Sequence, residues 1–305
     1  MRVAVSGATG RLGRALIAAL EEAAFSGPSG PIAWRRPDFD LDAPDGYSAL
    51  LDRDRPELVI HAAAWTDVDG CARDPELAEA RNGLATGRLA DETAARGIDL
   101  IVVSTNEVFD GRRPAHGRGY WPGDPPNPIN AYGASKREGE RLAARAYDVT
   151  AGNLGIVRTA WLYGPPGNDF PAKILAAAER AAAAGEPLRL VSDEVGSPTY
   201  TVDLADSIVE LVGSDGQLGG LHHIVNAGAA SRADWAREVL RQAGIDVSTE
   251  DVPASTWPRA STPPAWAVLE STPLPGGEPL RPWQAALADY LPQLLRQAAR
   301  ADAAR

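Results

Sequence analysis

The 305-residue chain has little of several features that define other classes of protein. Its single cysteine, Cys71, excludes an intramolecular disulfide, and its four histidines form no Cys/His cluster at metal-ligand spacing, so we expect no metal site. No apolar run approaches the roughly 20 residues that cross a bilayer. The N-terminal apolar segment reaches Gly7 too early for a signal peptide. These absences predict a soluble, cytoplasmic protein without a membrane partner.

Positive charge is scarce as well. Thirty basic residues stand against 41 acidic ones, and the resulting net charge of −11 has the wrong sign for general attraction to nucleic acid. We therefore expect no nucleic-acid partner, and any bound phosphate must be held by a local site. Lysine occurs only at Lys136 and Lys173, so nearly all of the positive charge is arginine.

In the first half of the chain, short β-branched apolar segments alternate with longer segments rich in Ala, Leu and Arg. This alternation is typical of βαβ units and a parallel sheet. The expected strands are residues 2–6, 31–35, 58–63, 98–104 and 154–161. The expected helices are residues 11–24, 75–96 and 132–146. The pattern predicts an α/β fold with a Rossmann-type, doubly wound parallel sheet.

Regularity decreases after about residue 160, where prolines become frequent. Strands are expected at residues 188–191 and 221–225, and helices at 201–212, 231–243 and 283–299. We predict a dinucleotide-binding domain over residues 1–160, completed by about 192–220. Residues 161–191 and 221–297 are expected to form a smaller mixed α/β substrate cap, and residues 298–305 a frayed tail.

A glycine-rich turn separates the first expected strand from the first expected helix. Gly7, Gly10 and Gly13 follow one another at spacings of three. Such a turn lets the backbone approach a pyrophosphate, which then faces the free N–H groups and the dipole of the helix N-terminus. An ordinary strand-to-helix turn is the alternative, but the position directly after an N-terminal strand favours dinucleotide binding. The spacing differs from the G-x-G-x-x-G of many dehydrogenases.

The second expected strand ends at Arg35 and Arg36, where an NAD-specific protein more often has an acidic residue for the ribose hydroxyls. Two arginines suit a 2′-phosphate, so NADP(H) is favoured as cofactor. Ordinary surface arginines, and with them NAD(H), remain the alternative.

Three residues in the middle of the chain suggest proton transfer to a carbonyl. Tyr132 and Lys136, four apart on an expected helix, share one face. A nearby ammonium favours a phenolate and lowers the pKa of the phenol, which makes a proton donor for a carbonyl that receives hydride. Thr105 ends a parallel strand, where open α/β sheets bind ligands, and its hydroxyl can hold the same oxygen. An incidental Tyr and Lys on a solvated helix is the alternative.

With these residues the chain resembles the extended short-chain dehydrogenase/reductases, and among them the dTDP-4-dehydrorhamnose reductase family. The matching segments extend almost from end to end: residues 7–13, 40–42, 61–69, 104–105, 108–111, 130–140, 158–164 and 192–199. The resemblance implies hydride transfer from a reduced nicotinamide to C4 of a nucleotide-linked 4-keto-6-deoxy sugar. The substrate it points to is dTDP-4-dehydro-L-rhamnose, in deoxysugar or polysaccharide synthesis.

The resemblance also implies roles for individual residues. Tyr132 is the acid, Lys136 holds the nicotinamide ribose and lowers the pKa of Tyr132, and Thr105 binds the substrate oxygen. Cofactor contacts are expected from Gly7, Thr9, Gly10, Arg11, Leu12, Gly13, Asp40, Leu41, Ala62, Ala63, Ala64, Thr66 and Ser104. Substrate contacts are expected from Val68, Asp69, Asn106, Glu107 and Trp161. A core aromatic is the other interpretation of Trp161.

Two segments depart from the family pattern. Asn106 and Glu107 stand where the family usually has Asp-Tyr, which resembles the acid pair of nucleotide-sugar 4,6-dehydratases with one acid missing. Glu107 either removes a proton next to a carbonyl or only reshapes the sugar pocket. Residues 262–269 lack the usual Arg-Pro pair, which leaves the exact substrate open.

Weaker candidates have structural interpretations. His222 and His223 lie in a strand-like run and are expected to be structural. Asp67, Asp69 and Asp74 suit helix capping better than a cation site. A homodimer and a bound metal are described for some members of the family, but no residue here indicates either.

Three functions therefore remain: a nucleotide-sugar reductase, a dehydratase or epimerase of the same superfamily, and a non-catalytic nucleotide-binding regulatory subunit. Stoichiometric consumption of NADPH separates the first from the second. The Thr105, Tyr132 and Lys136 set argues against the third, because a binding protein needs no tuned proton donor.

Overall fold

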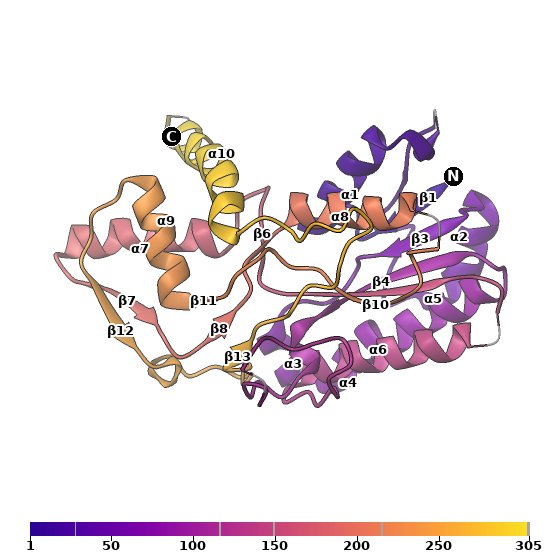
Figure 1. Ribbon diagram of the computed structural model, residues 1–305, viewed down its shortest axis with the longest axis horizontal. Coiled ribbons are helices and arrows are strands. Elements are labelled where there is room, and N and C mark those ends of the chain that lie inside the picture. Colours follow the sequence, from indigo (N-terminus) through magenta and orange to yellow (C-terminus); the bar gives the residue numbers. More distant parts are fainter. Residues whose placement is uncertain (28, 116, 149, 215, 304–305) are drawn as a thin grey trace.

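The β-branched apolar segments form a six-stranded parallel sheet in the computed structural model, which describes residues 1–27, 29–115, 117–148, 150–214 and 216–303. The strand order is β10-β5-β4-β3-β1-β2, and Figure 1 labels β10, β4, β3 and β1 of this sheet. The strands are Val3–Ser6 (β1), Ile32–Trp34 (β2), Leu58–His61 (β3), Asp99–Thr105 (β4), Leu154–Thr159 (β5) and Gly220–His223 (β10). The predicted doubly wound α/β fold is confirmed. All six carboxyl ends lie at one edge of the sheet.

Successive side chains of β1 point to opposite faces of the sheet, and each face is covered by a layer of helices. Val3 and Val5 pack on one face with α1 (Arg11–Glu22) and α8 (Thr201–Gly213). Ala4 packs on the other face with α2 (Tyr47–Asp54), α5 (Ala85–Ala94) and α6 (Ala131–Tyr147), and Figure 1 shows the two layers above and below the sheet. Because both faces are covered, the strands are apolar almost throughout.

The long helix expected at residues 75–96 is interrupted. It consists of α4 (Pro75–Ala78), a π-helical segment η3 (Glu79–Leu84) and α5, and the short α3 (Val68–Arg73) precedes it. In the π-helical segment, the buried Asn82 accepts a hydrogen bond from the Trp65 N–H at 2.8 Å. The remaining short helical turns are η1 (Ala24–Ser26), η2 (Pro44–Gly46), η4 (Asn106–Val108) and η5 (Ala254–Thr256).

A second hydrophobic cluster lies beyond the carboxyl edge of the sheet, and we refer to the elements around it as the cap. Its core includes Tyr163, Trp235, Trp283 and Tyr290. The cap helices are α7 (Phe170–Ala184), α9 (Arg232–Ala243) and α10 (Trp283–Ala303). Helix α7 was not expected from the sequence, although Asp169 caps it and eight of its 15 residues are alanine, the strongest helix former.

Short strands complete the cap in three small sheets. β7 (Leu188–Val191) pairs with β12 (Thr249–Val252), and β6 (Leu162–Tyr163) pairs with β9 (Thr199–Tyr200). β8 (Val195–Gly196) lies between β11 (Ala230–Ser231) and β13 (Trp266–Ala267).

Two boundaries differ from those expected. The strand expected in the cap at residues 221–225 is β10, which pairs with β5 as an edge strand of the large sheet. The expected frayed tail is helical as far as Ala303, and residues 304–305 lie outside the described residues. In the described part of the chain, no helix is both long and apolar enough to span a membrane.

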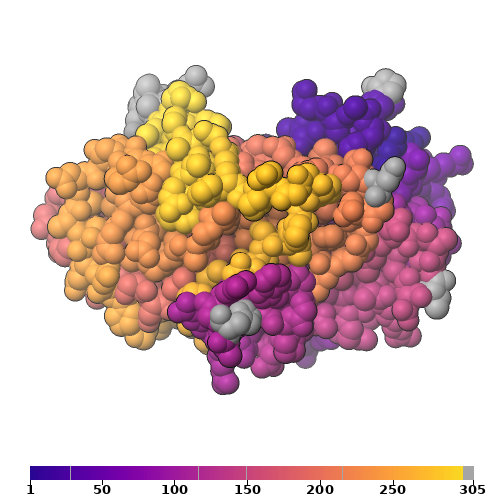
Figure 2. All heavy atoms as spheres, in the orientation of Figure 1, coloured from indigo at the N-terminus to yellow at the C-terminus, as the bar shows by residue number. Residues whose placement is uncertain are grey.

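The segment from β13 to α10 joins the cap to the sheet. Leu274 packs into the helical layer of α1 and α8, whereas Trp283 packs into the cap core. Thr272 donates its N–H to the carbonyl of His223 in β10 at 2.9 Å. Figure 2 shows this segment in gold, crossing the face of the molecule between the two parts.

Candidate active site

A cavity of about 690 Å³ lies at the carboxyl edge of the sheet, between the sheet and the cap. It is lined by most of the residues selected from the sequence: Gly7, Thr9, Gly10, Arg11, Leu12, Gly13, Arg35, Leu41, Ala62, Ala63, Ala64, Thr66, Val68, Ser104, Thr105, Asn106, Glu107, Tyr132, Lys136 and Trp161. Asp40 and Asp69 are not part of this lining. We call the part around Gly7 to Gly13 the glycine end, and the part around Glu107 and Trp161 the aromatic end.

At the glycine end, the backbone occupies the space that side chains would need. Gly7 has φ +68°, and a Cβ atom there would lie 2.8 Å from Ala63. A Cβ atom at Gly13 would lie 2.1 Å from the carbonyl oxygen of Gly7, well inside any normal contact. The turn is closed by the Gly10 N–H, which donates to Gly7 O at 2.9 Å. These glycines form a cradle that fits a pyrophosphate at the start of α1.

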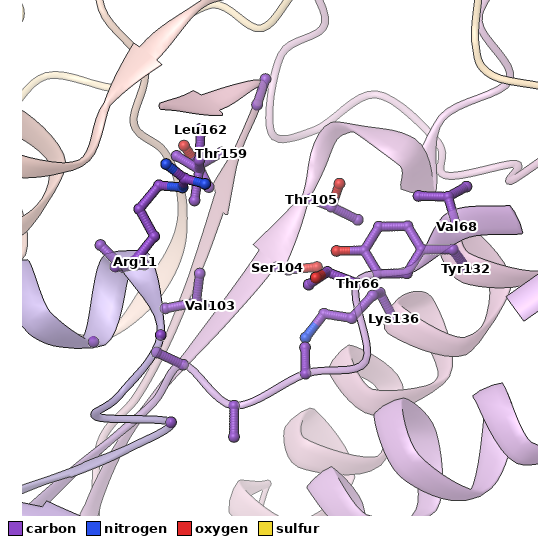
Figure 3. Close-up of a pocket in the computed structure, with 18 of the residues that line it drawn as sticks. Arg11, Thr66, Val68, Val103, Ser104, Thr105, Tyr132, Lys136, Thr159 and Leu162 are labelled. Atoms are coloured by element: carbon purple, nitrogen blue, oxygen red, sulfur yellow. The ribbon is translucent and has the colours of Figure 1, made fainter. Parts of the chain in front are cut away.

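The side chain of Arg11 leaves the glycine turn and reaches the cap. Its guanidinium donates to Gly164 O at 2.6 Å, to Asn168 Oδ1 at 2.7 Å and to Asp169 Oδ2 at 3.0 Å. Figure 3 shows it beside Thr159 and Leu162. Since Asp169 also caps α7, one arginine connects the turn to the first cap helix.

The two arginines after β2 differ in their surroundings. Arg36 forms ion pairs with Asp40 at 3.0 Å and Asp42 at 3.6 Å. Both arginines line the cavity, but the exposed side chain of Arg35 makes no hydrogen bond or ion pair within the described ranges. Its guanidinium is therefore available to an anion, whereas that of Arg36 is already neutralised. The carboxylate of Asp40 is engaged by Arg36 and is not part of the cavity lining.

Local packing brings Tyr132 next to Thr105. Asn130 caps α6 by accepting the Gly133 N–H at 2.8 Å. A Cβ atom at Gly133 would lie 2.0 Å from the carbonyl oxygen of Glu107, so only glycine permits this approach of the helix to the end of β4. The Thr105 hydroxyl accepts the Glu107 N–H at 3.2 Å. Figure 3 shows the hydroxyl of Tyr132 pointing toward the side where Ser104 and Thr105 lie, with Lys136 extending below the ring.

The acid–base properties of this group differ from the sequence expectation. Burial raises the pKa of Tyr132 and the Glu107 carboxylate raises it further, while the Thr105 hydroxyl opposes them. The expected lowering of the pKa of Tyr132 is therefore wrong in direction for this structure, because loss of hydration and the nearby carboxylate outweigh the hydrogen bond with Thr105. Burial lowers the pKa of Lys136 to about 8, against the attraction of Glu140. At neutral pH Tyr132 holds its proton.

A buried ion pair between Arg158 and Glu140 lies next to Tyr132 and Lys136 on helix α6. Arg158 donates from Nε and Nη2 to the two oxygens of Glu140 at 2.8 and 2.7 Å. Ser104, whose side chain lines the cavity, donates to the same carboxylate at 2.6 Å. Neither charged side chain is more than 1% exposed. Since Glu140 is one turn after Lys136 on α6, this ion pair fixes the helix face that carries the catalytic candidates.

A neutral histidine lies beneath the glycine end. His61 Nδ1 is 2.8 Å from the Ser6 hydroxyl, and its Nε2 is 3.1 Å from the Thr86 hydroxyl. Burial is the main cause that lowers the pKa of His61 to about 3. His223 is buried as well, with its Nδ1 3.0 Å from Tyr120 O, and it lies outside the cavity lining. Both histidines have structural positions.

Large side chains form the aromatic end. Trp161, with φ +43°, stacks on Trp235 at 5.8 Å between ring centroids. The guanidinium of Arg232 lies over the Trp161 ring, 3.6 Å from its centroid. Arg232 Nε also donates a hydrogen bond to Glu194 at 3.3 Å. Phe170, at the start of α7, stacks on Trp235 at 4.3 Å. Trp161 therefore packs against the cap core and faces the cavity as well.

The three aspartates considered for a cation site have other partners. Asp67 caps α3 by accepting the Gly70 N–H at 2.9 Å, and Asp74 caps α4 by accepting the Leu77 N–H at 3.0 Å. Asp69 accepts the Ser261 N–H at 3.0 Å and lies 3.5 Å from Arg259. Within the described ranges, no group of three or more His, Cys, Asp or Glu side chains is placed to hold a metal ion.

Sequence reasoning missed several residues of the lining. They are Trp34, Phe39, Val103, Thr159, Ala160, Leu162, Phe170, Arg232 and Trp235. Val103, Thr159 and Ala160 follow directly from the carboxyl ends of β4 and β5, so the strand pattern contains enough information to find them. The cap residues reach the cavity only through the tertiary fold, and nothing local in the sequence marks them.

The parallel sheet, its glycine turn and the Thr, Tyr and Lys side chains at its carboxyl edge define a short-chain dehydrogenase/reductase. Residues 1–296 match the family model described as the RmlD substrate binding domain, and the chain belongs to this family.

Two curated relatives and one solved structure are similar over nearly their whole lengths. The dTDP-4-dehydrorhamnose reductase of Streptomyces griseus is 34% identical over 303 residues, covering 97% of this chain and 95% of the relative. The dTDP-4-keto-6-deoxy-D-glucose reductase of Streptomyces niveus is 36% identical over 296 residues, covering 95% and 96%. The crystal structure of dTDP-4-dehydrorhamnose reductase from Bacillus anthracis in complex with NADP has a TM-score of 0.84 at 29% identity, covering 96% of this chain and 99% of that one.

Proposed function

We propose that this protein is an NADPH-dependent oxidoreductase that reduces the C4 ketone of a nucleotide-linked 4-keto-6-deoxy sugar. The observation that carries the proposal is one cavity in which a glycine cradle meets a half-buried tyrosine and a buried lysine beside a strand-end threonine. Relatives named as reductases of such sugars support it. The substrate we propose is dTDP-4-dehydro-L-rhamnose, reduced to dTDP-L-rhamnose in deoxysugar synthesis.

The glycine end suits the cofactor. The backbone of Gly7 to Gly13 and the start of α1 would hold the pyrophosphate, and Ala62 to Ala64 with Thr66 would border the rest of the groove. Arg35, exposed and without an acidic partner in the described part of the chain, would bind a 2′-phosphate and so favour NADPH over NADH. The NADP complex of the Bacillus anthracis relative supports this preference.

The side chains at the end of β4 and on α6 supply the proton. A reduced nicotinamide, when bound, supplies the hydride. Tyr132 Oη donates its proton to the ketone oxygen, and Thr105 Oγ1 donates a hydrogen bond to the same oxygen. Lys136 would hold the ribose of the cofactor, and its ammonium, with a pKa lowered to about 8, would return a proton to Tyr132. The raised pKa of Tyr132 keeps this proton in place until the oxygen becomes negatively charged.

The aromatic end would hold the sugar and its nucleotide. Val68, Asn106, Glu107 and Trp161 line it, and these are the residues for which substrate contact is proposed. Asp69 supports this end indirectly, since it binds Ser261 and Arg259 instead of facing the cavity.

We also infer three properties of the whole protein. Residues 1–160 with residues 201–223, which contain α8 and β10, would form the cofactor domain, and the remaining residues would form the substrate cap. A cytoplasmic location and a homodimer are proposed by analogy with the biosynthetic enzymes of the family. Light scattering of the purified protein measures the mass in solution, and a mass of one chain would contradict the homodimer.

The deciding experiment follows the absorbance of reduced nicotinamide with dTDP-4-dehydro-L-rhamnose, using NADPH and NADH in parallel. We expect one NADPH consumed per product, and a loss of turnover of about 10³-fold in Tyr132→Phe with unchanged cofactor binding. Consumption of neither cofactor would contradict the reductase proposal. Equal turnover in Tyr132→Phe would contradict the assigned acid.

A further inference from the structure

Glu107 is a half-buried acid that lines the cavity, and the reduction needs no second acid–base group there. It lies two residues after Thr105, and its carboxylate acts electrostatically on the phenol of Tyr132. Reduction of a ketone needs one proton donor at the oxygen, and Tyr132 fills that role. A second acid–base group beside the same carbonyl is therefore available for other chemistry.

The carboxylate of Glu107 is held in a fixed orientation. Asn130 Nδ2 donates to Glu107 Oε2 at 2.7 Å and to the Thr262 carbonyl at 3.1 Å. The other end of the same amide accepts the Gly133 N–H at 2.8 Å and so caps the helix that carries Tyr132. One side chain thus fixes Glu107 relative to the acid. Within the described ranges, Glu107 Oε1 has no hydrogen-bond partner.

The surroundings make this carboxylate a stronger base than a solvated one. Burial raises the pKa of Glu107, and nearby Glu194 acts in the same direction. Arg232 and Arg259 and the hydrogen bond from Asn130 oppose the shift but do not cancel it. A carboxylate with a raised pKa accepts protons more readily at neutral pH.

We propose that Glu107 removes and returns a proton on the carbon next to the ketone of the bound sugar, so that the protein exchanges this hydrogen with solvent without any hydride transfer. This inference rests on the proposed function, because it needs the same 4-keto sugar in the same cavity.

The step balances without a redox partner. Glu107 takes the proton, the C–H electron pair becomes the carbon–carbon double bond of an enol, and the ketone oxygen receives the proton of Tyr132. In the reverse direction Tyr132 recovers its proton, and Glu107 delivers a hydrogen that has exchanged with water. Thr105 stabilises the oxygen throughout. With one carboxylate on one face, the recovered sugar keeps its configuration and carries deuterium when the solvent is D₂O.

The experiment measures deuterium uptake by dTDP-4-dehydro-L-rhamnose in D₂O in the presence of the protein and NADP⁺, which supplies no hydride. Mass spectrometry gives the extent, and loss of a proton resonance in NMR gives the carbon. We expect the wild-type protein to exchange at least about 100-fold faster than Glu107→Gln. Glu107→Asp, which keeps the acid but shortens its reach, should fall between them.

Folding of the variants is checked by their affinity for NADPH, since Glu107 lies at the far end of the cavity from the glycine cradle. Wild-type exchange no faster than in the protein-free sample, or equal exchange in Glu107→Gln, would overturn the proposal. Exchange without any NADPH consumption in the separate reduction assay would support Glu107 as the base and overturn the reductase. The two proposals therefore fail in different measurements.

Discussion

Backbone shapes the glycine end of the cavity, whereas large side chains shape the aromatic end. At the glycine end the decisive feature is missing volume: no Cβ atom fits at Gly7 or Gly13. At the aromatic end Trp161, Phe170 and Arg232 fill the space from three separate segments of the chain. The first end suits the dinucleotide cofactor, and the second is where we expect a particular sugar to be selected.

The two ends also treat charge differently. The glycine end offers N–H groups and the unpaired Arg35 to an anion. The aromatic end contains both signs of charge, with Glu107 held by Asn130 and Arg232 held by Glu194. Substitutions should therefore separate the ends: changes at one should alter cofactor binding, and changes at the other should alter sugar binding.

The largest effect is expected from Gly13→Ala. The new methyl group would lie 2.1 Å from Gly7 O, so the turn must open. We expect the free energy of unfolding to fall by about 3 kcal/mol and NADPH affinity to fall at least about 100-fold. Gly46→Ala is the matched control, because nothing lies within 4 Å of its Cβ position and its φ is −75°. Denaturation and fluorescence titration measure both quantities, and wild-type affinity in Gly13→Ala would contradict the backbone cradle.

The free energy of unfolding should fall in acid because His61, buried next to the glycine end, is neutral in the folded protein. The folded protein keeps His61 neutral with a pKa of about 3, whereas the unfolded chain binds a proton near pH 6.5. The contribution of neutral His61 to the free energy of unfolding is therefore fully present above pH 6.5. It decreases as the pH falls, by about 2 kcal/mol between pH 6.5 and 5. Urea denaturation at several pH values measures the slope. His61→Gln should have a shallower slope, and an identical slope would show that His61 is not the group responsible.

At the aromatic end, Arg232→Lys should weaken binding of the sugar nucleotide and leave binding of the cofactor unchanged. An ammonium carries the charge but cannot lie flat on Trp161 or present a planar pair of donors. We expect KM for the sugar nucleotide to rise about tenfold, or about 1.4 kcal/mol, with an unchanged Kd for NADPH. Steady-state kinetics and cofactor titration together test this. A weaker Kd for NADPH with unchanged KM for the sugar would reverse the assignment of the ends.

The smallest effect concerns the two arginines after β2. Arg35→Ala should lower the affinity for NADPH about fivefold to tenfold and leave the affinity for NADH unchanged, since only NADPH carries the 2′-phosphate. Arg36→Ala should change NADPH affinity less than about threefold, because Asp40 already holds that guanidinium. Parallel titrations of both cofactors provide the comparison. Equal losses in the two variants would mean that the ion pair with Asp40 opens on binding.

The sequence predicted best what depends on neighbours along the chain. The strands, the glycine turn and the pairing of Tyr132 with Lys136 follow from local periodicity, and the structure places them as expected. Arg232 lies 71 positions after Trp161, and only the completed cap brings the two together. Asp40 and Asp69 occupy positions where the sequence pattern predicts ligand contacts. Their carboxylates instead pair with Arg36 and Arg259 and do not line the cavity. The raised pKa of Tyr132 depends on burial, which sequence spacing does not reveal.

The place of β10 in the sheet has a consequence for how the protein is made. The edge strand beside β5 is residues 220–223, and much of the cap lies between the two along the chain. A ribosome therefore releases the first cap segment while the sheet is still one strand short. A fragment that ends at residue 160 would expose the open edge of β5, a template for association with other chains. For expression and engineering, the two halves of this enzyme cannot be produced as separate pieces by a single cut.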